Sequence, residues 1–247
     1  MKIRLDKLLV ERGLAATRER AQALILAGRV LVNEQKLDKP GTSIPEGAPL
    51  RLLGGDLRYV SRGGLKLEAA LAQWQIDLRD RFCLDVGAST GGFTDCMLQH
   101  GATRVLAIDT GYGQIAQTLR DDPRVTLVER TNARYLAPGA LPPGISLFAV
   151  DVSFISATLV LRPVLEAIRP GAGPGLEAVI LIKPQFEAGR ERIGKGGIVR
   201  DAEAHQFAID RVRACVAELD GASIEVIDSP INGAEGNREF LLHALWV

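Results

Sequence analysis

The chain has 247 residues, and its 30 Lys and Arg side chains balance 30 Asp and Glu side chains. A formal net charge of zero excludes a protein that holds nucleic acid through a generally basic surface. The charges are unevenly distributed, because residues 1–40 contain nine basic and five acidic side chains. The length predicts one α/β domain of roughly 180 residues and a smaller domain, and the basic N-terminal segment is a candidate binding module.

The cysteines of the chain favour a reducing compartment, and its hydropathy favours a protein outside the membrane. Cys83, Cys96 and Cys215 are widely spaced and form no C-x-x-C pair, so we expect neither a disulfide framework nor a metal site. The N-terminus lacks the apolar core and cleavage site of a signal peptide. No apolar run approaches the roughly 18 residues that cross a bilayer. We therefore expect a soluble, cytoplasmic protein without membrane contact, and no segment indicates an obligate protein partner.

The first segment of the chain, residues 1–57, has the pattern of a small α+β domain. Leucines at helical spacing precede a glycine, and a threonine then stands where a second helix would need its N-cap. The predicted elements are, in order, a helix over 5–10, a helix from Thr17 to Gly28, a strand over 29–33, a turn at 34–35 and a strand over 49–53.

Four basic residues of this segment gather about the predicted helix starts: Arg4, Lys7, Arg18 and Arg20. Arg and Lys side chains neutralise phosphates, and structured RNA is bound by shape more than by base sequence. An ordinary solvated charged face is the alternative interpretation. The four residues are our candidates for binding RNA.

From residue 60 onward, apolar strand candidates alternate with amphipathic helical segments. This alternation predicts βαβ units, and hence a mostly parallel sheet with helices on both faces. The predicted strands are 82–86, 104–109, 125–129, 147–152, 178–182, 223–227 and 240–247, and the predicted helices include 65–73, 155–168 and 202–219.

A glycine-rich turn follows the first of these strands, at Gly87. Gly91 and Gly92 have no β-carbon, so backbone N–H groups there can approach a ligand at the start of a helix. Three residues separate Gly87 from the glycine pair, which departs from the G-x-G-x-x-G of dinucleotide enzymes and favours S-adenosylmethionine. Asp109 ends the next strand, 22 residues after Gly87, near the spacing of a carboxylate that binds ribose hydroxyls.

Two further strand ends carry charged residues, Asp151 and Lys183. Ligands of open α/β sheets lie beyond the carboxyl ends of the strands, so these positions are candidates for a site. Lys183 directly follows four apolar residues, an environment that disfavours a charge. A lysine that reaches the surface and pairs with an acid is the alternative.

With Lys66 and Glu239, these two residues complete a pattern that resembles a known family. The order Lys66, Asp151, Lys183, Glu239 around a Gly-Ala-x-x-Gly-Gly-Phe loop is similar to the Lys-Asp-Lys-Glu tetrad of FtsJ-like ribose 2′-O-methyltransferases. The motifs at 4–9, 18–21 and 26–33 resemble an S4 RNA-binding domain. Their combination resembles the TlyA rRNA methyltransferases, historically named haemolysin A.

The resemblance implies a Rossmann-like methyltransferase domain over 62–247, an S4 domain over 1–57 and a linker at 58–61. It implies that Lys183 is the general base and that Asp151 and Glu239 orient Lys183 and Lys66. A lysine in water has a pKa near 10.4, so a lysine base needs surroundings that favour its neutral form. The residues expected to bind S-adenosylmethionine are Asp85, Gly87, Ala88, Ser89, Gly91, Gly92, Phe93, Asp109, Asn132, Ala133 and Phe154.

The implied activity is 2′-O-methylation of a cytidine in ribosomal RNA, with ribosomal RNA or a ribosomal subunit as the partner. The chain resembles the shorter members of the family, which implies the large-subunit (23S) RNA. S4 modules also precede pseudouridine synthases, but those enzymes need no glycine-rich adenosine loop. Two alternatives remain open: a non-catalytic factor that binds or assembles ribosomes, and a membrane-lytic haemolysin.

Overall fold

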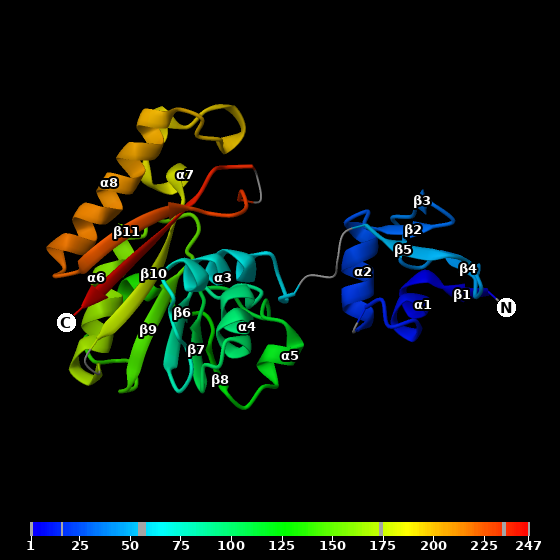
Figure 1. The fold of residues 1–247 in the computed structure, drawn as a ribbon, viewed down its shortest axis with the longest axis horizontal. Helices are drawn as coiled ribbons and strands as arrows, with labels where there is room; N and C mark the ends of the chain where they lie inside the picture. The colour runs from blue at the N-terminus through cyan, green and yellow to red at the C-terminus, as the bar shows by residue number, and fades with distance from the viewer. Residues whose placement is uncertain (1, 16, 54–57, 173–174, 234–235, 247) are drawn as a thin grey trace. The chain divides into compact units, whose positions relative to one another are not determined.

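The computed structural model describes residues 2–15, 17–53, 58–172, 175–233 and 236–246. The chain divides into two compact units, Met1–Arg58 and Tyr59–Val247 (Figure 1). The glycine-containing stretch at 54–57, where the sequence predicts the end of the first domain, lies outside the described residues.

The smaller unit packs two helices against short strands. Helices α1 (Leu5–Glu11) and α2 (Arg18–Leu26) follow strand β1 (Lys2–Arg4), and the Thr17 side chain accepts a hydrogen bond from the backbone N–H of Arg20, which caps α2. The remaining strands are β2 (Val30–Val32), β3 (Gln35–Lys36), β4 (Ser43–Pro45) and β5 (Leu50–Leu52). Leucine, isoleucine, valine and alanine side chains from both helices and from the strands form one core.

Two details of this unit differ from the prediction. Strand β1 pairs antiparallel with β4, and neither strand was predicted, because the pairing joins distant positions of the chain that local patterns do not connect. The turn after β2 is formed by Asn33 and Glu34, which both have positive φ, so Gln35 already belongs to strand β3.

The larger unit is built on a seven-stranded sheet in the order β11-β12-β10-β9-β6-β7-β8. Its central pairs are parallel, whereas β12 runs antiparallel to both of its neighbours. The sequence prediction of a mostly parallel α/β sheet is confirmed. The strands are β6 (Phe82–Val86), β7 (Arg104–Ile108), β8 (Val125–Val128), β9 (Ile145–Val150), β10 (Leu176–Ile182), β11 (Ala222–Asp228) and β12 (Phe240–Trp246).

Helices cover both faces of this sheet (Figure 1). Alternate side chains of the strands supply two hydrophobic clusters. One cluster packs against α6 (Thr158–Ile168) and α8 (Ala202–Glu218), and the other against α3 (Gly63–Gln73) and α4 (Gly92–Gln99). The shorter helical segments are α5 (Gln117–Arg120), α7 (Pro184–Glu187) and 3-10 turns at Ala133–Tyr135, Arg169–Gly171, Arg190–Arg192 and Lys195–Gly197.

The predicted linker at 58–61 includes residues that pack inside the larger unit. The Tyr59 side chain is buried and lies directly under Gly64, where a β-carbon would be only 2.3 Å from the Tyr59 ring. The backbone N–H of Val60 donates to the Asp95 carboxylate at 2.7 Å. The chain is therefore fixed to the larger unit from Tyr59 onward, at the junction of α3 and α4.

Candidate active site

The loops after four parallel strands meet at one edge of the sheet. Gly87 follows β6, Asp109 follows β7, Asp151 follows β9 and Lys183 follows β10. Because β12 runs in the opposite direction, its first residues reach the same edge, where Phe240 pairs with Ile182. The residue before β12, Glu239, thereby joins the group.

The loop after β6 contains glycines at positions where a side chain would collide. Gly87 has a φ of +90°, and a β-carbon on it would lie 2.4 Å from the carbonyl oxygen of Asp151. Gly91 has a φ of +94° and forms the N-cap of α4. A β-carbon on Gly92 would lie 2.3 Å from Ser61 Oγ. Glycine here allows the loop to approach the β9 loop and the start of α3 closely.

Asp85 lies beneath this loop and lines neither of the two pockets described below. Its side chain is fully buried, and Oδ2 accepts hydrogen bonds from the Thr94 N–H and hydroxyl at 2.9 and 2.7 Å. Oδ1 has no hydrogen-bond partner among the described residues. Burial raises the pKa of Asp85 to about 7, and the Thr94 hydrogen bonds oppose that shift. Asp85 was expected to contact the cofactor. Its side chain instead points into the protein, where it supports the first turn of α4.

Two adjoining pockets open at this edge of the sheet. The first, which we call the aspartate pocket, has a volume of about 350 Å³ and includes residues from the loops after β6, β7, β8 and β9. Asp109 Oδ2 accepts the Ser89 N–H at 2.8 Å, and Oδ1 accepts the Gly111 N–H at 2.6 Å, so backbone groups hold this carboxylate in place. The expected cofactor residues that line this pocket are Gly87, Ser89, Asp109, Asn132, Ala133 and Phe154.

Phe154 is placed at the rim of the aspartate pocket in an unusual conformation. Its φ is +64° and 91% of its surface is exposed, although phenylalanine disfavours both conditions. The ring contacts Phe186 at a centroid distance of 5.5 Å. Phe154 is therefore not part of the hydrophobic core, and its ring is available to a ligand.

The second pocket, the lysine pocket, has a volume of about 280 Å³ and contains three members of the predicted tetrad. Lys66, Asp151 and Lys183 line it directly. The fourth, Glu239, lies behind Lys66 and is bound to it, with Oε2 2.5 Å from Lys66 Nζ. The expected cofactor residues that line the lysine pocket are Gly87, Ala88, Ser89, Gly92 and Phe93. Gly91 lines neither pocket; it forms the left-handed turn at the N-cap of α4.

Each lysine of the tetrad has a carboxylate partner. Lys183 Nζ lies 2.6 Å from Asp151 Oδ1, and both side chains are largely buried. Lys66 and Glu239 are more deeply buried still. Opposite charges at these distances balance the charge of both ammonium groups inside a partly dry pocket. Glu239 also accepts a hydrogen bond from Lys66, whereas the contact between Lys183 and Asp151 is an ion pair without hydrogen-bond geometry.

Two residues that the sequence analysis did not select support this arrangement. Ser153 Oγ accepts a hydrogen bond from Lys183 Nζ at 2.8 Å and lines both pockets. Glu187, at the end of α7, accepts hydrogen bonds from the Ser156 hydroxyl at 2.5 Å and the Ala157 N–H at 2.6 Å. Burial raises the pKa of Glu187. Both residues stand in stretches that resemble the family, 151–156 and 183–187, but nothing in the sequence assigned either of them a role.

Comparisons with known proteins agree with this geometry. Residues 59–245 match the model of the FtsJ-like methyltransferase family, and residues 3–49 match that of the S4 domain. The 16S/23S rRNA (cytidine-2′-O)-methyltransferase TlyA of Mycobacterium tuberculosis is 43% identical over 97% of this chain and 88% of its own length. The chain belongs to the TlyA family of FtsJ-like methyltransferases.

Two further proteins are similarly close to this chain. YqxC of Bacillus subtilis is 51% identical over 99% of this chain and 86% of its own length. A solved Streptococcus thermophilus structure that carries the haemolysin name covers all of this chain with a TM-score of 0.74, at 44% identity and 89% coverage of its own chain. In the part of our TlyA-family chain that the structure describes, no helix is long and apolar enough to span a membrane.

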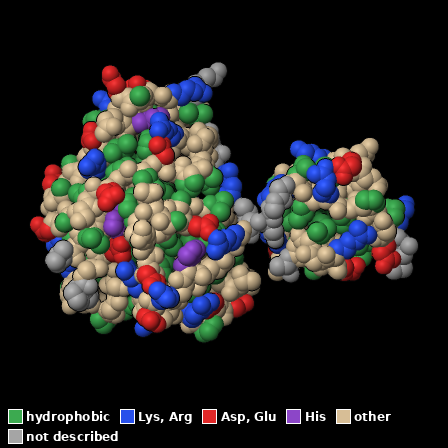
Figure 2. Space-filling view, in the orientation of Figure 1, with side chains coloured by type: hydrophobic (Ala, Val, Ile, Leu, Met, Phe, Trp, Pro, Cys, Tyr) green, Lys and Arg blue, Asp and Glu red, His purple; other side chains and the backbone are tan. Residues whose placement is uncertain are grey.

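The S4 domain of this TlyA-family chain carries the four predicted RNA-binding residues on its two helices and at their start. Arg4 is the N-cap of α1, Lys7 is in its first turn, and Arg18 and Arg20 are in the first turn of α2. Lys7, Arg4 and Arg18 are exposed, and Arg20 is half-buried. On the face of the larger unit seen in Figure 2, by contrast, Lys and Arg side chains alternate with Asp and Glu side chains.

Proposed function

We propose that this chain transfers a methyl group from S-adenosylmethionine to the ribose 2′-hydroxyl of a cytidine in ribosomal RNA. The observation that carries the proposal is the lysine pocket: two lysines, each with a carboxylate partner, line a cavity that shares Gly87 and Ser89 with the aspartate pocket. A donor in one pocket and an acceptor in the other would meet at this shared wall.

The residues of the aspartate pocket fit S-adenosylmethionine. Asp109 would accept hydrogen bonds from the ribose hydroxyls, and Asn132, Ala133 and Phe154 would surround the adenine. The glycine-rich loop would receive the methionine end, because Gly87 and Ser89 line both pockets and the loop leads into the N-terminus of α4. When bound, this cofactor supplies an electrophilic methyl group.

The lysine pocket would orient the acceptor and remove its proton. Lys183 Nζ, held by Asp151 and Ser153, would accept the proton of the 2′-hydroxyl after it has lost one of its own. Lys66, held by Glu239, would hydrogen-bond the acceptor oxygen. Because the four charged groups interact, they would titrate as one unit.

The acceptor class rests on the S4 domain and on the relative named as a 16S/23S rRNA methyltransferase. The basic residues at the helix starts would bind phosphates of folded RNA. We propose the large-subunit RNA as the main substrate, as expected from the resemblance, and an activity on ribosomal RNA would place the protein in the cytoplasm.

A methyl-transfer assay tests this function. Labelled S-adenosylmethionine is incubated with unmethylated large and small ribosomal subunits and either the wild type or Lys183→Ala, and any methylated ribose is mapped. We expect transfer to a cytidine of the large subunit by the wild type and a loss of roughly 100-fold or more in Lys183→Ala, because a positioned base contributes about that much. Arg79→Ala, which removes an exposed ion pair with Asp77, is the control and should remain active.

Each outcome of this assay tests a different part of the proposal: the reaction, the substrate or the general base. If the wild type transfers no methyl group to either subunit, the function is wrong, and binding without transfer would support the non-catalytic ribosome factor. Transfer to the small subunit alone would contradict the proposed substrate. Full activity of Lys183→Ala would leave the reaction in place and exclude Lys183 as the base.

A further inference from the structure

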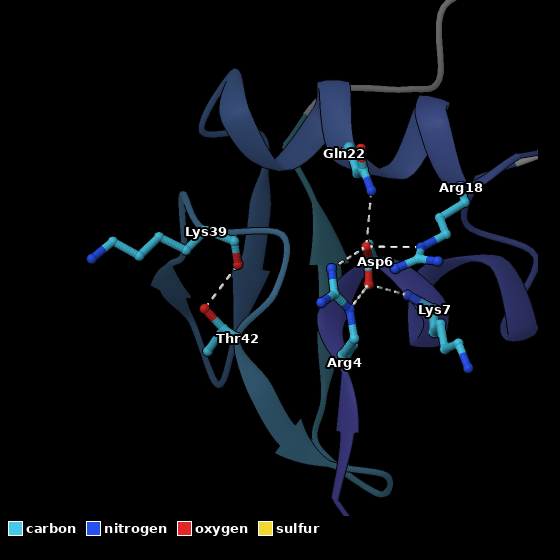
Figure 3. A network of polar contacts seen from close by, with 7 residues as sticks. All are labelled: Arg4, Asp6, Lys7, Arg18, Gln22, Lys39 and Thr42. Atoms are coloured by element: carbon cyan, nitrogen blue, oxygen red, sulfur yellow. Dashed lines mark hydrogen bonds and ion pairs between the residues drawn. The ribbon is translucent and has the colours of Figure 1, made fainter.

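One acidic side chain stands at the centre of the basic residues of the S4 domain. Asp6, in the first turn of α1, is completely buried, and its carboxylate accepts five hydrogen bonds (Figure 3). Arg4 donates through Nε and Nη2 at 3.0 and 2.8 Å, and Arg18 donates through Nε at 3.0 Å. Gln22 Nε2 and the backbone N–H of Lys7 complete the set at 3.0 and 2.9 Å.

The Asp6 contacts hold the two arginines by one side of each guanidinium group. Arg18 uses Nε alone, which leaves both of its terminal nitrogens for another ligand, and Arg4 keeps Nη1 and one N–H of Nη2. About half of each side chain remains exposed, 45% for Arg4 and 46% for Arg18, whereas Asp6 has no exposed surface. Asp6 is thus bound by both arginines but cannot itself meet a ligand at the surface.

The charges in this group favour an anionic ligand. One buried carboxylate faces two guanidinium groups, so the arginines keep a net positive charge after pairing. The hydrogen bonds from Arg4, with those from Gln22 and Arg18, outweigh burial and lower the pKa of Asp6 well below its usual range. Asp6 therefore stays ionised under the conditions in which RNA binds.

The arginines of this group come from two different elements. Arg4 ends strand β1, and Arg18 begins helix α2, so the Asp6 carboxylate fixes their separation as well as their directions. Exposed arginines lose rotamer freedom when they bind a ligand, and side chains held in place beforehand lose less. A pair of oriented guanidinium groups can bind phosphate oxygens through paired N–H donors.

We propose that Asp6 is a positioning residue for RNA docking, which holds Arg4 and Arg18 as a preformed pair of phosphate-binding groups. The inference rests on the proposed action on ribosomal RNA. It assigns an acidic residue a favourable role in binding a polyanion, which is opposite in sign to the effect expected from its charge alone. This opposite sign makes the proposal testable.

The test compares Asp6→Asn with Glu34→Gln in the full-length chain. Glu34 is an exposed acid of the same domain that also pairs with an arginine, Arg51, so its replacement removes the same charge without disturbing the Asp6 group. Binding of each protein to unmethylated ribosomal subunits is measured over a range of KCl concentrations. We expect Asp6→Asn to bind about tenfold more weakly, with a smaller salt dependence because fewer phosphates are contacted. Glu34→Gln should bind as tightly as the wild type or more tightly.

A double-mutant cycle distinguishes positioning from loss of folding. In a chain that already carries Arg4→Gln and Arg18→Gln, Asp6→Asn should weaken binding no further, because Asp6 acts through those two arginines. If Asp6 only maintained the fold of the domain, the substitution would still remove the contacts of Lys7 and Arg20 and weaken binding again. Hydrogen exchange of the α1 and α2 amides reports directly whether the domain stays folded.

The outcomes of this test are separable from those of the proposed function. Asp6→Asn that binds subunits as tightly as the wild type, or more tightly, would overturn the positioning role, and so would a further loss in the double-arginine background. Failure of the wild type itself to bind either subunit would contradict the proposed function before Asp6 is considered.

Discussion

The buried carboxylate of Asp85 makes the stability of the larger unit depend on pH. Its pKa is about 7 in the folded protein, because burial penalises the charge, compared with about 3.8 in the unfolded chain. Between these values the folded state binds more protons than the unfolded state. The contribution of Asp85 to the free energy of unfolding therefore falls as the pH rises from about 4 to 7, and it is constant above that range.

Asp85→Asn should remove this pH dependence. From pH 5 to pH 8 we expect the wild type to lose about 3 kcal/mol more unfolding free energy than the variant, since the folded pKa lies about two units above pH 5 and each unit corresponds to about 1.4 kcal/mol. Urea denaturation of both proteins at several pH values measures the difference. Parallel stability curves for the two proteins would mean that Asp85 is already ionised at pH 5 in the folded state.

At the scale of single residues, the sequence shows which residues belong to the site better than it shows where their side chains point. Asp109 and Lys183 could be selected because each directly follows a buried strand, and parallel strands end at one edge. Asp85 could not be assigned in the same way, because it stands inside strand β6 and neighbouring positions face opposite sides of a sheet. The structure brings Lys66 and Glu239 together across 173 positions, a contact that only the family resemblance could suggest.

At the scale of elements, Glu187 closes the start of helix α6 from another part of the chain. The N-cap residue of α6 is Ala157, whose side chain cannot accept a hydrogen bond, and Glu187 Oε1 accepts its N–H. The Ser156 hydroxyl donates to the other carboxylate oxygen. The segment between β9 and α6 carries Asp151 and Ser153, so this contact also fixes one wall of both pockets.

Replacing Glu187 tests this role. Glu187→Ala leaves the Ala157 N–H without its acceptor in a buried place, which should cost about 2 kcal/mol and lower methyl transfer. The Ser156 hydroxyl keeps a partner in Thr158 Oγ1, at 2.6 Å. Glu187→Gln keeps an acceptor and should lose less. Glu166→Ala, which removes an exposed glutamate within α6, should change stability by less than about 0.5 kcal/mol. Thermal melting measures the stability of the three variants, and the methyl-transfer assay measures their activity. Equal losses of stability in Glu187→Ala and Glu187→Gln would contradict the capping role.

Most long elements were predictable, whereas several of the short ones were not. Strands β6 and β10 are continuous apolar runs, and α8 has a clear N-cap in Asp201, so their patterns are unambiguous. Helix α6 begins at Thr158, three residues later than expected, because the preceding residues form the Phe154 turn. The segment β1, at three residues, depends on its pairing with β4, a contact between distant positions that local patterns do not contain.

At the scale of the whole molecule, the two units have separate hydrophobic cores. Residues 3–52 supply the whole core of the smaller unit, and residues 59–246 supply those of the larger one. A domain of fewer than 60 residues is close to the lower limit of independent stability. We therefore expect the two units to unfold in separate transitions, the smaller one first.

A fragment of residues 59–247 tests whether cofactor binding and RNA docking belong to separate units. We expect it to fold and to bind S-adenosylmethionine within about threefold of the full chain, because the aspartate pocket lies in the larger unit. Methyl transfer to ribosomal subunits should fall by roughly 100-fold, since the proposed RNA contacts of the S4 domain are lost. Calorimetry measures the first quantity and the labelled assay the second. Undiminished transfer would show that the S4 domain does not provide docking.

The ion pair between Lys66 and Glu239 has a consequence for the order in which activity is acquired. It joins α3, the helix before the first strand of the larger unit, to the residue that precedes β12, the last strand in chain order, which lies between β10 and β11. Contacts of such large sequence separation form late, because the intervening chain must first be ordered. A partly folded chain would have the glycine-rich loop but no complete tetrad. Methyl transfer should therefore begin only when refolding is finished, so its onset reports when the complete seven-stranded sheet has formed.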